Sequence, residues 1–222
     1  MPEAGFVART QVQSAACRPS GGIEIRQAGR ADAEAIRSFI TGLSPRTQYR
    51  RFFAGVSPPS SALLRGLCGT GNGADIIVAA CDGAGYGGLI VGHAMAADGT
   101  AADGTPAVEV GLVVADGSQR RGIGSALMRV LLARAVARGA RAVVMDVQPG
   151  NADVLAMIGR HWPGARREST ADSVLIRARL TGPALAPAPA PGPGSRALPG
   201  SWERPRELPH LPAVTAAAGQ PS

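Results

Sequence analysis

The sequence of 222 residues contains no lysine, so arginine supplies all 23 of its Lys and Arg residues. This absence excludes a catalytic or Schiff-base lysine, and it excludes a P-loop, because the GxxxxGK[ST] motif needs one. Arginine keeps its charge and can bind a phosphate through two parallel hydrogen bonds. The net charge of +7 therefore favours anionic ligands, although it says nothing about the fold.

Cysteine is also scarce. Cys17, Cys68 and Cys81 are odd in number and form no CxxC pair, which argues against a disulfide framework and against a zinc site. We therefore expect a reducing, cytoplasmic location and no metal. No apolar run has the length that a membrane span needs, so we expect a soluble protein without a membrane partner.

Aromatic residues make up only 4% of the chain, although hydrophobic residues make up 45%. Ala, Val and Leu must therefore do most of the core packing. The basic composition alone does not support nucleic-acid binding, because the sequence shows neither a recognition motif nor an aromatic platform for bases.

Composition divides the chain into three parts. Residues 1–20 are polar and lack periodicity, which predicts a disordered arm. Residues 181–222 are dense in Pro, Ala and Gly, and they predict a disordered tail, because proline cannot donate the backbone hydrogen bonds of helices and sheets. Trp202 in this tail is either a docking anchor or a solvent-exposed residue. We expect the folded domain at 21–180.

Strand and helix patterns alternate within the folded part. Apolar residues at every second position predict strands, and apolar residues recurring every three or four positions predict helices. Successive strands without a helix between them are expected to pair antiparallel. The predicted fold class is α+β (α/β), a mixed sheet covered by helices. The expected strands are 22–28, 74–82, 87–98, 107–116, 141–148 and 172–180, and the expected helices are 31–43, 44–53, 60–67, 121–139 and 151–161.

The stretch DGSQRRGIGSALM (116–128) joins a predicted strand to the longest predicted helix. Backbone N–H groups at the start of a helix point outward with the positive end of the helix dipole, and glycines let an anion come close. A dinucleotide-binding loop would need GxGxxG. Gly122 and Gly124 match this motif, but Leu127 stands at its third glycine. The stretch therefore predicts an anion site that fits NAD poorly.

The segment Gln119-Arg120-Arg121-Gly122-Ile123-Gly124 has the pattern Q/R-x-x-G-x-G/A after a strand. It resembles the pyrophosphate-binding motif of the GNAT superfamily of N-acetyltransferases. The preceding EVGLVV and the following helix, strand and helix resemble the same family, and the likeness covers nearly all of 22–180. It implies a mostly antiparallel mixed sheet with helices on both faces, in which strand 107–116 splays from strand 141–148.

The resemblance implies acetyl-CoA as the acyl donor. The N–H groups of 120–125 would bind its pyrophosphate, and the backbone of strand 107–116 would bond to the pantetheine arm and the acetyl group. Asn151 either contacts this arm or caps the next helix. The residues expected to bind acetyl-CoA are Leu112, Val113, Val114, Gln119, Arg120, Arg121, Gly122, Ile123, Gly124, Ser125 and Asn151.

Direct acetyl transfer needs a neutral amine, whereas a lysine-like amine with a pKa of about 10.4 arrives protonated. A base must remove a proton. Glu109 is the candidate, because it is the one acid among the valines of its strand and matches a glutamate with this role in several members of the family. Strand alternation places Glu109 on one face with Gly111 and Val113. We expect partial burial to raise its pKa; the alternative is a half-exposed acid paired with an arginine.

No residue is assigned as the general acid, because helix 151–161 lacks the tyrosine that many relatives carry there. His161, at the end of this helix, and His93, on an apolar strand, are expected to be structural.

The acceptor is suggested by LSPRTQYRRFF (43–53). It resembles a segment of the acetyltransferase domain of bacterial protein-lysine acetyltransferases, which implies an N-acetyltransferase acting on a primary amine such as a protein lysine. The alternatives are a small amine, such as an antibiotic or a metabolite, and a catalytically silent CoA-binding module. The sequence leaves the oligomeric state open, a homodimer included.

Overall fold

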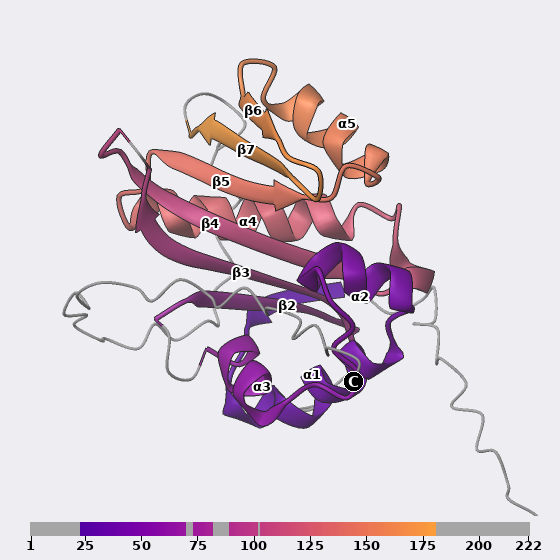
Figure 1. Ribbon diagram of the computed structural model, residues 1–222. Coiled ribbons are helices and arrows are strands. Elements are labelled where there is room, and N and C mark those ends of the chain that lie inside the picture. Colours follow the sequence, from indigo (N-terminus) through magenta and orange to yellow (C-terminus); the bar gives the residue numbers. More distant parts are fainter. Residues whose placement is uncertain (1–22, 70–72, 82–88, 102, 181–222) are drawn as a thin grey trace, which may run out of the picture. The chain divides into compact units, whose positions relative to one another are not determined.

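The computed structural model describes residues 23–69, 73–81, 89–101 and 103–180 (Figure 1). The arm predicted at 1–20 and the tail predicted at 181–222, with Cys17 and Trp202, lie outside these residues. Two short 3₁₀ helices, Arg30–Asp32 and Asp116–Ser118, accompany the main elements. In chain order these are β1 (Ile23–Gln27), α1 (Ala33–Gly42), α2 (Pro45–Phe52), α3 (Ser61–Leu67), β2 (Asp75–Cys81), β3 (Ile90–Thr100), β4 (Pro106–Val114), α4 (Ile123–Ala137), β5 (Ala142–Val147), α5 (Ala152–His161), β6 (Arg166–Ser169) and β7 (Val174–Arg179).

The strands form one seven-stranded sheet in the order β1-β2-β3-β4-β5-β7-β6. Neighbouring strands are antiparallel except β4 and β5, which pair parallel. The α+β prediction of a mixed, mostly antiparallel sheet is therefore confirmed. Strand β6 was not predicted, because its four residues are all exposed and show no apolar alternation.

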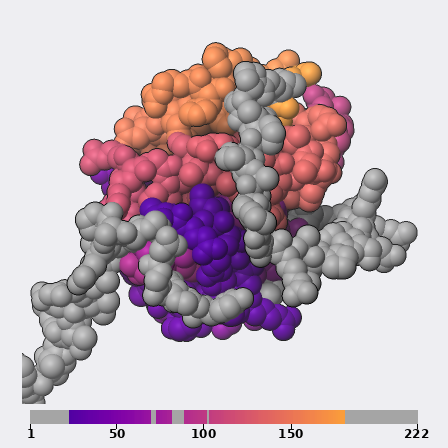
Figure 2. All heavy atoms as spheres, turned by 180° about the vertical axis from the view of Figure 1, so that it is seen from behind, coloured from indigo at the N-terminus to yellow at the C-terminus, as the bar shows by residue number. Residues whose placement is uncertain are grey.

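Helices cover both faces of this sheet. The buried side chains of α4, among them Leu127 and Leu131, pack with Val108 and Val110 of β4 in one core cluster. Ile36 and Ile40 of α1 pack with Val113 in a second cluster on the opposite face. Figure 2 shows the molecule from behind, with the middle of the chain, α4 included, between the indigo N-terminal and the orange C-terminal parts.

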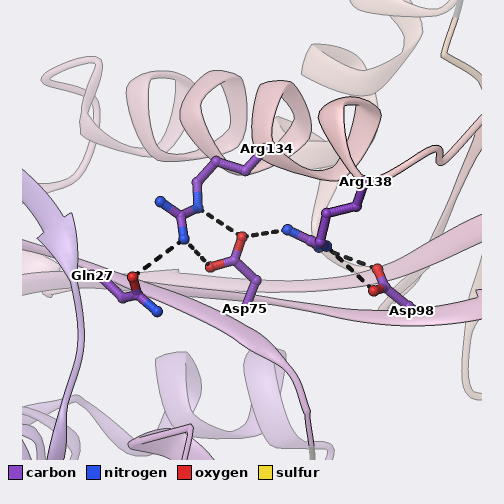
Figure 3. A network of polar contacts seen from close by, with 5 residues as sticks. All are labelled: Gln27, Asp75, Asp98, Arg134 and Arg138. Carbon is purple, nitrogen blue, oxygen red and sulfur yellow. Dashed lines mark hydrogen bonds and ion pairs between the residues drawn. The ribbon is translucent and has the colours of Figure 1, made fainter. Parts of the chain in front are cut away.

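A polar network ties the C-terminal half of α4 to the sheet (Figure 3). The buried carboxylate of Asp75 in β2 accepts hydrogen bonds from Arg134 at 2.7 and 2.9 Å and from Arg138 at 2.6 Å. Arg138 also pairs with Asp98 of β3 at 3.1 Å. The helix then ends before Gly139, whose φ of 103° is a left-handed conformation that favours glycine.

Serine side chains cap the N-terminal ends of α2 and α3. The Ser44 hydroxyl accepts a hydrogen bond from the N–H of Thr47, and the Ser60 hydroxyl accepts one from the N–H of Leu63, at 3.2 Å each. Pro45 occupies the first turn of α2, where its missing N–H costs nothing.

The cysteines differ from expectation in one respect. Cys68 is a free, buried thiol, but Cys81 is disulfide-bonded. Spacing along the sequence did not reveal this bond, because a disulfide requires only that two cysteines lie close in the folded chain. Within the described residues, no helix has both the length and the apolar character needed to cross a membrane, and no cluster of three His, Cys, Asp or Glu side chains could hold a metal ion.

His93 is a packed core residue, as predicted. Its side chain is fully buried, and Nε2 donates to the carbonyl oxygen of Leu67 at 2.9 Å. Burial lowers the pKa of His93 to about 4, because a charged imidazole would lose its hydration there. The ring is therefore neutral at pH 7.

Candidate active site

The main feature of the site is an opening between β4 and β5. The two strands pair only at Ala107, Val108 and Glu109, opposite Ala142, Val143 and Val144. Beyond Glu109, β4 continues to Val114 and stays paired with β3 throughout. Its other edge has no strand partner among the described residues, which confirms the expected splay.

Strand alternation decides which backbone groups face this opening. The N–H of Ala115 donates to the carbonyl oxygen of Val91 in β3 at 2.9 Å. The backbone N–H and C=O groups of every second residue, counted from Ala115 toward the start of β4, therefore point toward β3. Val113 and Gly111 are among these residues. The N–H and C=O groups of Leu112 and the N–H of Val114 point into the opening. Of the three strand residues expected to contact acetyl-CoA through the backbone, only Leu112 and Val114 have suitable groups on this side.

The loop between β4 and α4 has a row of N–H groups without a partner among the described residues. None of the backbone N–H groups from Arg120 to Ser125 donates to another described residue, and no side chain caps α4. Arg120 and Gly122 have φ values of 60° and 81°, a left-handed geometry of the kind that forms anion-binding nests. Arg120 and Arg121 are exposed and form no ion pair within the described part of the chain.

The other predicted loop residues face the protein. Gln119 donates through Nε2 to the carbonyl oxygen of Val114 at 3.1 Å and to the Thr47 hydroxyl at 3.4 Å, so its side chain braces the loop. Ile123 is buried in the core, and the Ser125 hydroxyl lies 3.9 Å from the sulfur of Met157. Gly124 lies beside Leu112 and Val114, and a Cβ there would be 3.5 Å from the Leu112 side chain.

Asn151 precedes α5, but its side chain makes no capping hydrogen bond. The helix-cap role considered for it is therefore absent, and its contact with the cofactor arm stays a prediction. His161 lies at the other end of α5, where its Nδ1 is 3.0 Å from the carbonyl oxygen of Met157, in keeping with a structural role.

Glu109 stands at the last position where β4 and β5 still pair. Together with Val144 and Arg177 it lines a cavity of about 200 Å³. The expectation of partial burial was wrong: Glu109 is exposed and forms no ion pair with a described residue. The reason is that the core cluster on this face of the sheet reaches β4 at Val113, so none of the described helices packs over Glu109.

Arg51 is a residue of this site that was not predicted from the sequence. Its guanidinium, reaching from α2, lies directly on Gly111: a Cβ on this glycine would be 2.2 Å from Nη2. The Nε atom is buried without a hydrogen-bond partner. Burial lowers the pKa of Arg51 to about 10, while the charge of Glu109 acts to raise it. Gly111 was the available signal, because a glycine inside a strand often marks the close approach of another group.

Helix α2 lies in front of the ends of β3 and β4, next to the opening (Figure 1). At its N-terminal end, Asp116 accepts hydrogen bonds from the N–H and hydroxyl of Ser44 at 2.9 and 2.7 Å. At its C-terminal end, Gln148 donates to the carbonyl oxygen of Tyr49 and Arg50 to that of Gly150, at 3.2 Å each. One helix thus connects the loop after β4 with the loop after β5.

A family model described as "Acetyltransferase (GNAT) family" matches residues 46–161, which contain the opening, the loop and α5. The chain belongs to the GNAT family. It is therefore an acyltransferase, and acetyltransferases of this family use acetyl-CoA as the donor. A comparison with curated protein sequences found no match.

Solved GNAT structures share the fold. The GNAT domain of PAT from S. lividans is 24% identical, with a TM-score of 0.59 over 71% of this chain and 90% of that one. A phosphinothricin acetyltransferase from Sinorhizobium meliloti, in complex with AcCoA, is 22% identical, with a TM-score of 0.54 over 77% and 96%. NAA60 from Arabidopsis thaliana, in complex with a bisubstrate analogue, is 16% identical, with a TM-score of 0.53 over 72% and 100%.

Proposed function

We propose that this GNAT protein transfers the acetyl group of acetyl-CoA directly to a primary amine, with Glu109 as the base. The observation that carries the proposal is the unpaired edge of β4. This edge begins beside Glu109 and leads to the loop whose N–H groups are unpaired at the start of α4.

The residues at this edge suit acetyl-CoA. The N–H groups from Arg120 to Ser125 and the positive end of the α4 dipole would bind its pyrophosphate, and the exposed Arg120 and Arg121 would add charge. The backbone groups of Leu112 and Val114 would hydrogen-bond to the pantetheine arm as a neighbouring strand does. When bound, acetyl-CoA supplies the activated acetyl thioester.

Glu109 would supply the proton transfer that the acceptor needs. An ammonium has no lone pair, so the acceptor must lose a proton to Glu109, directly or through a water molecule, before nitrogen can bond to the acetyl carbon. The exposure of Glu109 favours relay through water. As the N–C bond forms and the C–S bond breaks, the N–H of Leu112 points into the opening, where it can stabilise charge on the carbonyl oxygen. The departing thiolate takes the second proton, which the nitrogen releases as the amide forms, so the products are the amide and the free thiol of CoA.

A protein lysine is the first candidate acceptor. The segment that resembles protein-lysine acetyltransferases forms α2, the helix next to the opening, and the GNAT domain of S. lividans PAT has the same fold. A small amine is the second candidate, because the cavity beside Glu109 has a volume of about 200 Å³.

The test is thiol release from acetyl-CoA with a panel of lysine peptides, amino acids and aminoglycoside-type amines. Acetylation of at least one class, identified by a mass increase on the amine, supports the proposal. Binding of acetyl-CoA without turnover on any acceptor would instead support a silent CoA-binding module.

A further inference from the structure

Arg51 holds an unused set of hydrogen-bond donors. No nitrogen of its guanidinium donates to a described residue, and only Nε is fully buried without a partner. Nη1 and Nη2 are equally unpaired, but they keep contact with solvent. The contact with the ring of Phe52, 4.9 Å from the ring centre, uses the flat face of the group and leaves the N–H bonds available.

The neighbouring strand is shaped to receive this side chain. Any Cβ at Gly111 would overlap the guanidinium, at 2.2 Å from Nη2 and 2.4 Å from Cζ. Its neighbours Val110 and Leu112 point to the opposite face of β4, and Val113 on the same face is buried. Arg51 therefore occupies a defined place on β4, in the part of the strand that no longer pairs with β5.

An unpaired cation in a mostly buried place is unfavourable unless an anion joins it. With a pKa of about 10, the guanidinium stays charged at pH 7. The nearby acid Glu109 forms no ion pair with it. The phosphates of acetyl-CoA are not suitable partners, because the start of α4 packs beside Leu112 and Val114 on the opposite face. The remaining partner on this face of the sheet is the acceptor.

We propose that the guanidinium of Arg51 binds a carboxylate of the acceptor, so that the acceptor presents a carboxylate close in space to its reacting nitrogen. Glu109 and Gly111 lie on one face, two residues apart, which is roughly 7 Å along a strand. An amine at Glu109 and a carboxylate at Arg51 therefore fit one small amino acid. They also fit a protein lysine beside an acidic residue. The proposal rests on the proposed acetyl transfer and names its acceptor class.

The kinetic test compares acceptors in matched pairs: glycine with glycinamide, and a Lys-Asp peptide with a Lys-Asn peptide. In at least one pair the carboxylate member should have a higher kcat/KM by roughly tenfold, mainly through KM, as expected for a charge-assisted pair of hydrogen bonds. The pair that shows the difference identifies the source of the carboxylate. Arg51→Gln should remove the difference by weakening only the carboxylate member.

Arg50→Gln is the matched control, because Arg50 lies on the same helix and donates to Gly150 instead. It should keep the preference. Arg51→Lys, which keeps the charge but loses the paired donors, should keep part of it. Two results would overturn the proposal: equal use of both members by the unaltered protein, or an equal fall in kcat for both members in Arg51→Gln, which would assign Arg51 to the reacting centre.

A binding test separates this proposal from the proposed function. The protein saturated with CoA is titrated with N-acetylglycine and with N-acetylglycinamide, and chemical shifts give the two affinities. Tighter binding of the carboxylate, lost in Arg51→Gln, supports the role of Arg51 even if no acceptor is turned over. The proposal for Arg51 is wrong if N-acetylglycine and N-acetylglycinamide bind equally well, or not at all, and the kinetic preference is also absent. If no acceptor is turned over, only the proposed acetyl transfer is wrong.

Discussion

The carboxylate of Asp116 accepts a hydrogen bond from the hydroxyl of Thr47 at 2.7 Å. This contact joins the loop that precedes α4 to the helix next to the opening, and Gln119 adds a second contact to the same hydroxyl. The loop expected to bind the donor is therefore held by the helix expected to border the acceptor.

The first prediction concerns this link. Thr47→Val removes the hydroxyl and should lower the free energy of unfolding by about 1.5–3 kcal/mol, the usual contribution of a hydrogen bond to a charged group. It should also raise the KM for acetyl-CoA, because Gln119 and the loop lose a support. Urea unfolding and steady-state kinetics measure the two effects. Thr41→Val, at an exposed position of α1, is the control and should change neither.

The same link should depend on pH in a defined direction. Burial alone would raise the pKa of Asp116, but hydrogen bonds from the Ser44 N–H and from the Thr47 and Ser44 hydroxyls lower it below its ordinary value. A lowered pKa in the folded state adds stability above the unfolded value near 3.8, and this stability disappears as pH falls through the folded value. The difference in melting temperature between the wild-type protein and Asp116→Asn should therefore be largest near pH 7 and shrink below pH 4. A constant difference would contradict this account.

The second prediction concerns Glu109. Glu109→Gln keeps the size of the side chain but removes the base, so kcat should fall by roughly 10²–10⁴, while the shift in melting temperature caused by acetyl-CoA should persist. Stopped assays at several pH values measure the rate. The rate should recover partly at high pH, where more of the acceptor amine is already neutral.

Glu34→Gln is the control for this variant. Glu34 is an exposed glutamate of α1 that pairs with Arg37. Since it is not assigned to proton transfer, its replacement should leave kcat near the wild-type value. Equal losses in the two variants would mean that Glu109 is not the base.

The third prediction concerns the anion site at the start of α4. Gly124→Glu adds a negative charge beside the unpaired N–H groups, and the shift in melting temperature caused by acetyl-CoA should disappear. The protein should still fold, because a Cβ at Gly124 meets the Leu112 side chain at 3.5 Å, an ordinary contact. Gly124→Gln is the uncharged control and should keep more of the shift. An equal shift of the wild-type protein by NAD would show that the loop is not specific for CoA.

Local patterns were sufficient to predict most elements of this fold. Side-chain periodicity predicted both the long helix α4 and the shorter helix α2. The edge strand β6 could not be found in this way, because it is held by pairing with β7 and its own side chains are all exposed. Long-range pairing of this kind leaves little trace in four residues.

The part of the candidate site that lies within one segment of the chain could be predicted. The part that is formed where separate segments come together was harder to predict. The loop 119–125 could be recognised because its glycines and N–H groups are consecutive in the chain. The exposure of Glu109 could not be predicted, because it depends on which helix covers that part of the sheet. Arg51 was missed for the same reason: its partner Gly111 lies far along the chain, and only the fold brings the two together.

The fourth prediction concerns His93 and acid sensitivity. Burial lowers the pKa of His93 from 6.5 to about 4; the hydrogen bond to Leu67 opposes the shift, and the charge of Arg51 adds to it. Between these two pH values the unfolded chain binds a proton that the folded chain does not, so stability should fall as pH decreases, by up to about 3 kcal/mol at 1.4 kcal/mol per pH unit. Unfolding in urea at pH 7, 6, 5 and 4 measures this slope. His93→Gln, which can still donate to the carbonyl oxygen of Leu67, should reduce this slope.

An NMR titration of the His93 ring gives an independent check. In Arg51→Gln the pKa of His93 should rise, because a nearby positive charge has been removed. An unchanged pKa in that variant would show that the guanidinium does not act on the core histidine.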